Sequence, residues 1–480
     1  MKKIAIIGGG VAGGTAALYL SKIGLNVTLF DKNNSLVSGP PFCHLHAGGN
    51  LYREISDEQC ITLLHQSIDL LRFYPYAIDY RPTLIVTPTL DNHSPSSLLP
   101  RLELLKKEYL KSIQNDINNK VLGEVDEYFK IYTKEDLENF QKLDTPKNPR
   151  TLDEWMIQPS KNIILDKIQF PVIMVQEYGL NIFRLSAGIN NELNTLENCT
   201  THLNTTVKNI TRKNSWYEIE YMHNKQNSCE YFDYIINAAG YNTGTIDNML
   251  GFKRDRFVEF KAAYVTKWDQ SENLWPEIIF HGQRGTPNGM GQFTPYPDGY
   301  VQVHAMTKDI TLFDNGLTKS TKDDAQPNLG ASFQRKIQNH HWEESETKQR
   351  TIKAIEHLAQ YIPSFKNAIV ASKPLYGAQQ IPGDDEDLRA ADVSFENENY
   401  ARCEVVKASS VLDMIDAIVM KLINLEYVDK NCLYKRDLHY NTINEDKILS
   451  YAQEICKQRE YPSSLAKVTV SRELIEKKGA

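Results

Sequence analysis

Three glycines near the start of the chain have the spacing of a phosphate-binding turn. Gly8, Gly10 and Gly13 follow the apolar run of residues 4–7 in the pattern G-x-G-x-x-G. In such a turn the first glycine permits a sharp bend, the second lets a pyrophosphate approach the backbone, and the third lets the next helix pack closely on a sheet. The free N–H groups at the start of that helix favour a phosphate charge. These glycines therefore predict a bound dinucleotide.

An acidic residue completes the unit. Residues 26–30 form a second apolar run, and Asp31 follows them directly. A carboxylate in this place can accept hydrogen bonds from a ribose diol. Strand, glycine turn, helix, strand and acid in this order are more specific than the glycines alone. The predicted cofactor contacts in this unit are Gly8, Gly10, Ala12, Gly13, Asp31 and Lys32.

Two histidines are candidates for proton transfer. His44 and His46 lie in residues 40–50, an irregular segment with two prolines and two adjacent glycines. A segment so close behind the second strand would lie along the cofactor. Histidine suits a general base near neutral pH, because its ordinary pKa is close to neutrality. The alternative for either residue is a loop histidine that bonds to the backbone.

Three arginines could anchor a substrate carboxylate, because a guanidinium offers two parallel N–H donors. Arg389 and Arg402 flank the stretch that leads into a predicted C-terminal helix at residues 411–425, and Arg284 comes from a strand-rich region. Each of them could instead form a structural or surface ion pair. Position alone adds further candidates for the lining of the pocket: Tyr296, His304, Tyr376, Gln379 and Gln380.

The composition argues against several classes of protein. Of the 480 residues, 41% are apolar and 24% are charged, as in soluble globular proteins. The net charge of −7 without a basic block argues against nucleic acid as a partner. No apolar stretch is long enough to span a membrane, and the N-terminal apolar run is the nucleotide-binding strand rather than a signal peptide. Seven scattered cysteines without metal-ligand spacing indicate reduced thiols in a cytoplasm and no metal site.

The apolar pattern predicts the elements that must position these residues. Residues 97–161 are rich in Lys, Glu and Leu and predict two or three amphipathic helices. We expect a solvated helical insertion there, with a partner- or membrane-facing surface as the alternative. Residues 205–236 predict a small antiparallel meander, and residues 252–341 predict a mostly antiparallel sheet. Other segments predict a strand at 82–88, helices at 56–73, 181–196 and 343–358, an irregular segment at 373–383 and a charged helical tail after 431.

Four segments resemble the D-amino-acid-oxidase-like superfamily of FAD-dependent oxidoreductases, with a more distant likeness to malate:quinone oxidoreductases. The glycine unit with Asp31 matches the family's ADP-binding unit, and the Asn-Ala-Ala-Gly of residues 237–240 is similar to its second FAD contact. Residues 46–49 stand where the family runs a glycine-containing segment past the isoalloxazine ring. Residues 206–208 resemble the strand that contacts the adenine. The turn at residues 407–410 departs from the family pattern, because it lacks glycine before the helix that points at the flavin carbonyl.

The resemblance implies FAD as the cofactor. No second nucleotide-binding unit follows in the sequence, so a dedicated nicotinamide domain is not expected. Cys43 or a neighbouring histidine could tether the flavin covalently, as in some relatives. The resemblance adds these predicted FAD contacts: His46, Gly48, Gly49, Val207, Ala239, Gly240, Lys407, Ala408 and Ser409.

The resemblance also implies an activity. We expect an oxidoreductase that oxidises a small amino or hydroxy acid by hydride transfer to flavin N5, with His44, His46, Arg389 and Arg402 as the catalytic candidates. The electrons would pass to a quinone, oxygen or another acceptor, and a quinone would bring this cytoplasmic protein to the inner face of a membrane. One alternative is an FAD-dependent monooxygenase or halogenase-like enzyme, against which the lack of a late Gly-Asp-Gly segment counts. A second alternative is a flavin-binding protein without turnover.

The sequence thus predicts an α/β chain, α+β overall. Its Rossmann-like FAD-binding domain would hold a central parallel sheet and the β-meander, and a mostly antiparallel sheet would form the substrate domain. The expected FAD-binding parts are residues 1–95, 164–250 and 371–430. The expected helical insertion is 96–163, the substrate domain 251–370 and the C-terminal helical tail 431–480.

Overall fold

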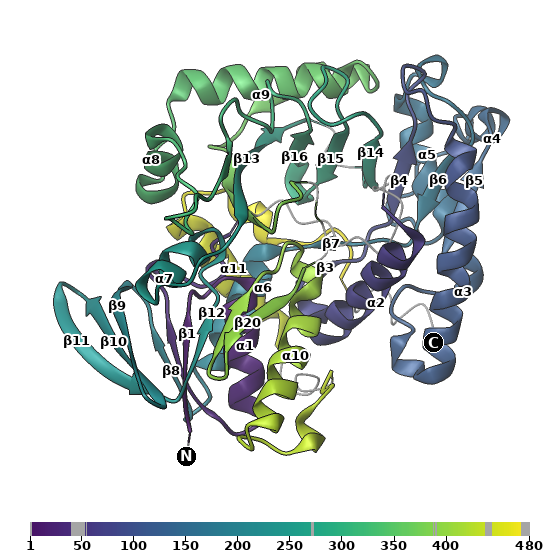
Figure 1. Cartoon of the computed structure of the whole chain (residues 1–480). Coiled ribbons are helices and arrows are strands. Elements are labelled where there is room, and N and C mark those ends of the chain that lie inside the picture. The colour runs from purple at the N-terminus through teal and green to yellow at the C-terminus, as the bar shows by residue number, and fades with distance from the viewer. Residues whose placement is uncertain are drawn as a thin grey trace.

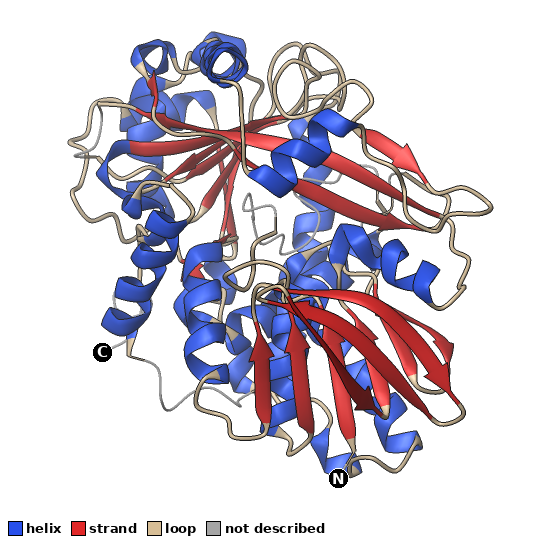
Figure 2. Cartoon of the chain, turned by 90° about the vertical axis from the view of Figure 1, so that its left-hand side faces the viewer, coloured by secondary structure: helices blue, strands red, loops and turns tan. Residues whose placement is uncertain are grey.

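Two large sheets dominate the computed structural model of the chain, with helices between and around them (Figures 1 and 2). The structure describes residues 2–39, 53, 55–269, 273–386, 388, 391–436 and 444–471. The predicted fold class, a Rossmann-like α/β domain combined with a second, mostly antiparallel sheet, is confirmed.

The first sheet has six strands in the order β20-β21-β12-β1-β2-β8. Strand β1 lies between β2 and β12 and is parallel to both, with Ile7 opposite Phe30 on one side and Asn237 on the other. Because parallel strands end at the same edge of a sheet, the residues after β1, β2 and β12 meet there. The strands are β1 (Lys3–Ile7), β2 (Asn26–Phe30), β8 (Cys199–His202), β12 (Tyr234–Asn237), β20 (Val393–Asn397) and β21 (Tyr400–Cys403).

Strand β1 is apolar along its length because both of its faces are covered. Ile4 and Ile6 point into the core formed with the helices α1, α6 and α10. Ala5 and Ile7 point the other way, toward the predicted meander, as the two-residue period of a strand requires. The covering elements are α1 (Val11–Lys22), α6 (Ile182–Leu193), α10 (Val411–Asn424), β9 (Thr205–Lys213), β10 (Trp216–His223) and β11 (Gln226–Phe232).

The second sheet has ten strands and is mostly antiparallel. Its longest strand, β13, pairs with β16, β17, β18 and β19, and helix α9 lies across one face of the sheet (Figure 1). The elements are β13 (Arg256–Lys267), β14 (Glu277–Phe280), β15 (Gly291–Pro295), β16 (Tyr300–Ala305), β17 (Leu317–Lys319), β18 (Ile369–Val370), β19 (Leu375–Pro382) and α9 (Glu344–Ala359), with β4 (Thr83–Val86), β5 (Phe129–Tyr132) and β6 (Val172–Val175) at the far end.

Two segments differ from the sequence-based expectations. The predicted strand at 82–88 is β4, but it extends the second sheet rather than the FAD-binding domain. The segment at 373–383, predicted to be irregular, contains β19, which pairs with β13 over its full length. Gly377 weakens the strand signal of this segment, and the long pairing partner overrides that local preference.

The C-terminal region is also more than a charged tail. Helix α11 (Glu445–Gln458) packs against α6, and its residues Ile448, Ala452 and Ile455 are buried in the main core. Their spacing is that of one helix face. Downstream, the Asp79 carboxylate accepts hydrogen bonds from the backbone N–H groups of Thr469 and Val470.

The insertion is helical as predicted, with one short strand added. Helices α3 (Leu99–Asn115), α4 (Lys134–Phe140) and α5 (Leu152–Asn162) form it, and β5 joins the edge of the second sheet. Capping boxes at Thr133 and Thr151 fix the starts of α4 and α5.

The remaining elements are α2 (Asp57–Phe73), α7 (Thr243–Met249), α8 (Ala331–Asn339), β3 (Ile78–Asp79) and β7 (Gly179–Leu180). Within the described ranges, no helix has the length and apolar character to cross a membrane.

Candidate functional site

A cavity of about 1570 Å³ lies where the edge of the first sheet meets the second sheet. Its wall on one side is formed by the turn after β1, the end of β2 and the residues after β12. The opposite wall is formed by β13, β15, β16 and β19 of the second sheet. The turn before α10 and the end of α11 contribute the remaining sides.

The glycine turn has the geometry that its spacing predicts. Gly8 has a φ of +101°, and a Cβ on it would lie 2.4 Å from the Ala238 carbonyl oxygen. A Cβ on Gly13 would lie 1.8 Å from the Gly8 carbonyl oxygen, so only glycine permits this packing. Gly10 instead faces open space in the cavity, with no described atom within 4 Å of the position that a Cβ would take. The turn therefore fits a phosphate-containing ligand that approaches the backbone at Gly10.

Asp31 lies at the edge of the same cavity and is 6% exposed. Its two carboxylate oxygens accept hydrogen bonds from the backbone N–H groups of Gly9 (2.6 Å) and Asn33 (2.7 Å). Burial raises the pKa of this carboxyl group, while the two N–H donors oppose the shift. Each oxygen retains acceptor capacity, as a ribose diol would require. Lys32 also lines the cavity, with its ammonium 3.2 Å from the Tyr241 hydroxyl.

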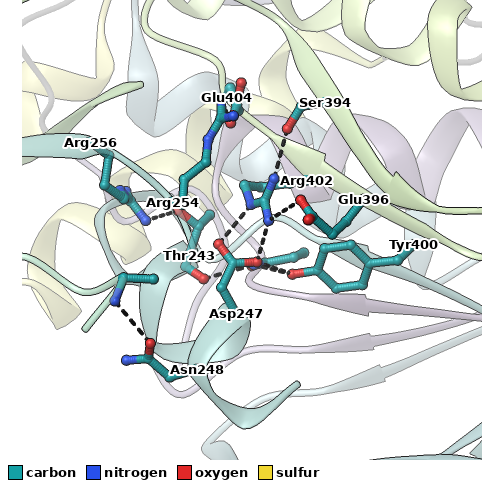
Figure 3. A network of polar contacts seen from close by, with 12 residues as sticks. Thr243, Asp247, Asn248, Arg254, Arg256, Ser394, Glu396, Tyr400, Arg402 and Glu404 are labelled. Atoms are coloured by element: carbon teal, nitrogen blue, oxygen red, sulfur yellow. Dashed lines mark hydrogen bonds and ion pairs between the residues drawn. The ribbon is translucent and has the colours of Figure 1, made fainter. Parts of the chain in front are cut away.

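The turn after β12 is fixed by a buried polar network. Asn237 donates hydrogen bonds to the Tyr400 hydroxyl (2.7 Å) and the Thr243 carbonyl (2.9 Å). Tyr400 in turn donates to Asp247 at 2.6 Å (Figure 3). This network orients Ala239 and Gly240, which line the cavity.

Arg402 belongs to this network and not to the cavity wall. It is 1% exposed, and its guanidinium donates to both oxygens of Asp247 at 2.7 and 2.8 Å, with Ser394 and Glu396 as further partners (Figure 3). These ion pairs raise the pKa of Arg402 against the effect of burial. The structure thus corrects the expectation of Arg402 as a substrate anchor, because its donors already hold α7 against β21.

Most predicted cofactor contacts are brought together by the fold. Gly13 packs behind the glycine turn, and its role is to allow close approach. Several predicted site residues lie outside the described residues: Cys43, His44, His46, Gly48, Gly49 and Arg389. The predicted contacts that line the cavity are Gly8, Gly10, Ala12, Asp31, Lys32, Val207, Ala239, Gly240, Lys407, Ala408 and Ser409. Contact of these residues with the cofactor stays a prediction.

The wall formed by the second sheet carries two cations. The Lys261 ammonium lies 2.8 Å from Glu259 and 2.8 Å from the Gln379 amide oxygen. Arg284 forms an ion pair with the other oxygen of Glu259. The sequence pattern pointed to Arg284 but not to Lys261, although a lysine between the apolar residues Phe260 and Ala262 of a buried strand is a signal of a special role.

A histidine lies beside these cations. His304 lines the cavity, and its Nδ1 lies 3.4 Å from the Gln292 amide oxygen. Burial lowers the pKa of His304 to about 3, and the positive charges of Lys261 and Lys407 act in the same direction. The imidazole is therefore neutral near pH 7.

Of the other position-based candidates, Tyr376, Gln379 and Gln380 line the cavity, whereas Tyr296 lies outside its described lining.

The end of α11 was not predicted to be part of the site. Arg459 and Tyr461 line the cavity, next to the ion pair of Lys373 with Glu460 at 2.6 Å. His340, at the C-terminal end of α8, accepts or donates a 2.9 Å hydrogen bond with the Tyr376 hydroxyl. The sequence offers only the amphipathic pattern of α11 as a signal, because these residues come from distant parts of the chain.

Comparison with known proteins relates the N-terminal part of the chain to flavoenzymes. Residues 3–130 match the family model described as FAD dependent oxidoreductase. The matched range includes two of the four segments that carry the resemblance, the glycine unit with Asp31 and residues 46–49. A search of curated proteins found no matching sequence.

Solved structures share the fold over most of the chain. Glycine oxidase from Geobacillus kaustophilus is 11% identical with a TM-score of 0.56, covering 92% of this chain and 100% of that one. L-proline dehydrogenase from P. horikoshii is 15% identical with a TM-score of 0.52, covering 89% and 94%. L-alpha-glycerophosphate oxidase from Mycoplasma pneumoniae, with FAD bound, is 16% identical with a TM-score of 0.53, covering 88% and 95%. At these identities the likeness shows a common fold.

Proposed function

We propose that this chain, an FAD-dependent oxidoreductase with the D-amino-acid-oxidase-like fold, oxidises a small amino or hydroxy acid. When bound, FAD supplies the acceptor for a hydride at its N5 atom. The chain itself must bind the acid, orient its C–H bond and receive the proton of the neighbouring O–H or N–H group.

The observation that carries this proposal is the pair of cations that flank Glu259 on the wall of the cavity, Lys261 in β13 and Arg284 in the loop after β14. Lys261 and Arg284 line the same cavity as Gly10 and Gly240 of the two predicted FAD-binding turns. Arginine and lysine bind carboxylates strongly when water is excluded, and an arginine can do so with two parallel hydrogen bonds. The substrate carboxylate would thus lie at the sheet, and the reacting carbon between the sheet and the first domain.

The kind of substrate agrees with the structural neighbours. They include a glycine oxidase and an L-proline dehydrogenase, whose names refer to small amino acids, and a glycerophosphate oxidase. The Arg284 and Lys261 side chains on the wall formed by the second sheet can bind the carboxylate groups of the acids among these compounds. The proposed substrate class is therefore a small carboxylate with an amino or hydroxyl group on the carbon to be oxidised.

His304 is better suited to hydrogen bonding than to proton uptake. Its pKa, lowered to about 3, makes the imidazolium form unfavourable near neutral pH. Its position beside Gln292 and Lys261 would let it orient the polar groups of the substrate. The role of general base stays with His44 or His46 as proposed from the sequence, and Arg389 remains a further proposed carboxylate contact.

The electron acceptor completes the proposed reaction. Oxygen or a quinone would reoxidise the flavin, and a quinone would require contact with a membrane surface. Rapid mixing of the reduced enzyme with oxygen or with a short-chain quinone would compare the two rates of reoxidation.

The proposal is tested by anaerobic titration of the flavin absorbance. We expect the absorbance to bleach with at least one compound from a panel of amino and hydroxy acids. Bleaching by NADPH alone would instead indicate a monooxygenase. No bleaching by any of these compounds would contradict the proposal.

Variants at the wall formed by the second sheet test the proposed carboxylate contact in the same titration. Arg284→Met should weaken binding of the bleaching acid about tenfold or more, because a hydrogen-bonded contact with a charged group contributes roughly 1.5–3 kcal/mol. Arg212→Met, which removes an exposed arginine of the meander strand β9, should leave binding unchanged.

A further inference from the structure

Arg459 follows the last residue of α11 and points its guanidinium at the loop behind Asp31. It donates hydrogen bonds to the Ser35 hydroxyl at 2.9 and 3.2 Å, to the Leu36 carbonyl at 2.7 Å and to the Val37 carbonyl at 3.1 Å. The side chain also lies over the Phe183 ring, with its central carbon 5.9 Å from the ring centre. Both Arg459 and Phe183 line the cavity.

The loop that Arg459 holds packs directly on the glycine turn. The backbone N–H of Val37 donates to the Gly9 carbonyl at 2.8 Å. A Cβ on Gly9 would lie 2.4 Å from a methyl carbon of Leu36, so loop and turn are in close contact. Arg459 therefore lies behind the turn at which a diphosphate would bind.

The groups that accept hydrogen bonds from Arg459 within the described part of the chain are neutral. All its hydrogen-bond acceptors among the described residues are hydroxyl and carbonyl oxygens. Asp31 attracts it only through space, and Glu460 is engaged by Lys373. Burial lowers the pKa of Arg459 to about 10, so the guanidinium remains charged at neutral pH. A partly buried cation whose hydrogen-bond acceptors are neutral is stabilised when an anion comes close.

The charged groups near the turn among the described residues are compatible with a bound anion. Among the described residues, Asp31 and Lys32 place one carboxyl group and one amino group beside the turn, and the guanidinium of Arg459 adds a positive charge at this end of the cavity. The N-terminus of α1 adds the positive end of a helix dipole. A diphosphate at Gly10 would meet this positive field and supply the negative charge that Arg459 lacks among its described contacts.

We propose that Arg459 provides a partly buried counter-charge for the diphosphate of FAD, and that the C-terminal helix α11 is thereby part of the cofactor site. Arg459 acts on the diphosphate through its charge and through the loop of residues 35–37, which it holds on the glycine turn. The proposal concerns cofactor binding and does not depend on the identity of the substrate.

The test compares two ligands that differ only in the diphosphate. ADP and adenosine are titrated by calorimetry into the full-length chain freed of flavin, and the ratio of their affinities is taken within each variant. The ratio is independent of any general loss of folded protein. Arg459→Gln should reduce the preference for ADP by about tenfold, because it removes the charge but keeps a donor for the loop.

Two further variants separate charge from shape. Arg459→Lys retains the charge and should retain most of the preference for ADP. Lys457→Gln removes an exposed charge two residues earlier, within the same helix, and should leave the ratio unchanged. Higher salt should reduce the difference between Arg459→Gln and the unaltered chain, because salt screens a charge interaction.

Two results would overturn the proposal. One is an unchanged ratio in Arg459→Gln, which would remove any role of its charge. The other is an equal loss in Arg459→Lys and Arg459→Gln, which would assign the effect to the hydrogen bonds of the loop alone.

Discussion

At the scale of single residues, the site depends on where a side chain is absent as much as on where one is present. Gly13 has no room for a Cβ, because the Gly8 carbonyl oxygen lies 1.8 Å from that position. Gly10 has room for a Cβ, but the space belongs to the cavity. The same amino acid is therefore required by packing at one position, and we expect it to be required by the bound dinucleotide at the other.

This difference gives a matched pair of variants. Gly13→Ala should destabilise the flavin-free chain by about 1–3 kcal/mol, because the helix must move away from the turn. Gly10→Ala should leave the flavin-free chain within about 0.5 kcal/mol of its original stability and should nevertheless bind FAD much more weakly. Urea unfolding of the flavin-free proteins and titration with FAD measure the two effects. Equal stability losses in both variants would contradict the assignment.

Residue chemistry also explains which predictions failed. Arg402 has the residue type of a carboxylate anchor, and the sequence shows no sign that Asp247, 155 positions away, is its partner. Lys261 was overlooked because the sequence alone does not show that its strand is buried, and only the pairing of β13 places this lysine in the cavity wall.

At the scale of elements, the C-terminal helix α11 differs most from its sequence-based interpretation. Its charged residues suggest a solvated tail, but Ile455 is 1% exposed and packs in the main core. The helix carries Arg459 to the loop of residues 35–37, over 400 positions earlier in the chain. Periodicity predicts such a helix, but a contact of this sequence separation leaves no local pattern.

The packing of α11 predicts a large stability effect. Ile455→Ala should destabilise the chain by about 2–5 kcal/mol, because it removes buried methyl groups and leaves a cavity. Lys447→Ala, on the exposed side of the same helix, should change stability by less than about 0.5 kcal/mol. Urea unfolding followed by far-UV circular dichroism measures both. A change at Ile455 as small as that at Lys447 would mean that α11 is a loosely attached tail.

At the scale of the whole molecule, features that depend on residues close in sequence could be predicted, and features that depend on long-range pairing could not. The unit β1-α1-β2 could be predicted in detail, because its strands, turn and helix are neighbours in sequence and each residue type fits its own element. The meander and the insertion helices were predictable for the same reason. The placement of β4 and β19 in the second sheet was not, since a strand's partner is decided by long-range pairing.

The two sheets together create the site, and neither contains it alone. The first contributes Gly10, Asp31 and Gly240, and the second contributes Lys261 and Arg284. Gln379 and Gln380 of β19 connect them, because their amide groups donate to the carbonyls of Val406 and Cys403 ahead of α10. The proposed hydride transfer requires this arrangement, since the substrate must be held between an anchor on one sheet and a flavin on the other.

The proposed reaction breaks a C–H bond of a small amino or hydroxy acid as the flavin is reduced. The most direct measurement is the anaerobic rate of flavin bleaching, by rapid mixing, with the active acid and with the same acid deuterated at the carbon to be oxidised. We expect the deuterated acid to reduce the flavin clearly more slowly at saturating concentration. Equal rates for the two acids, or bleaching by none of the panel, would contradict the account.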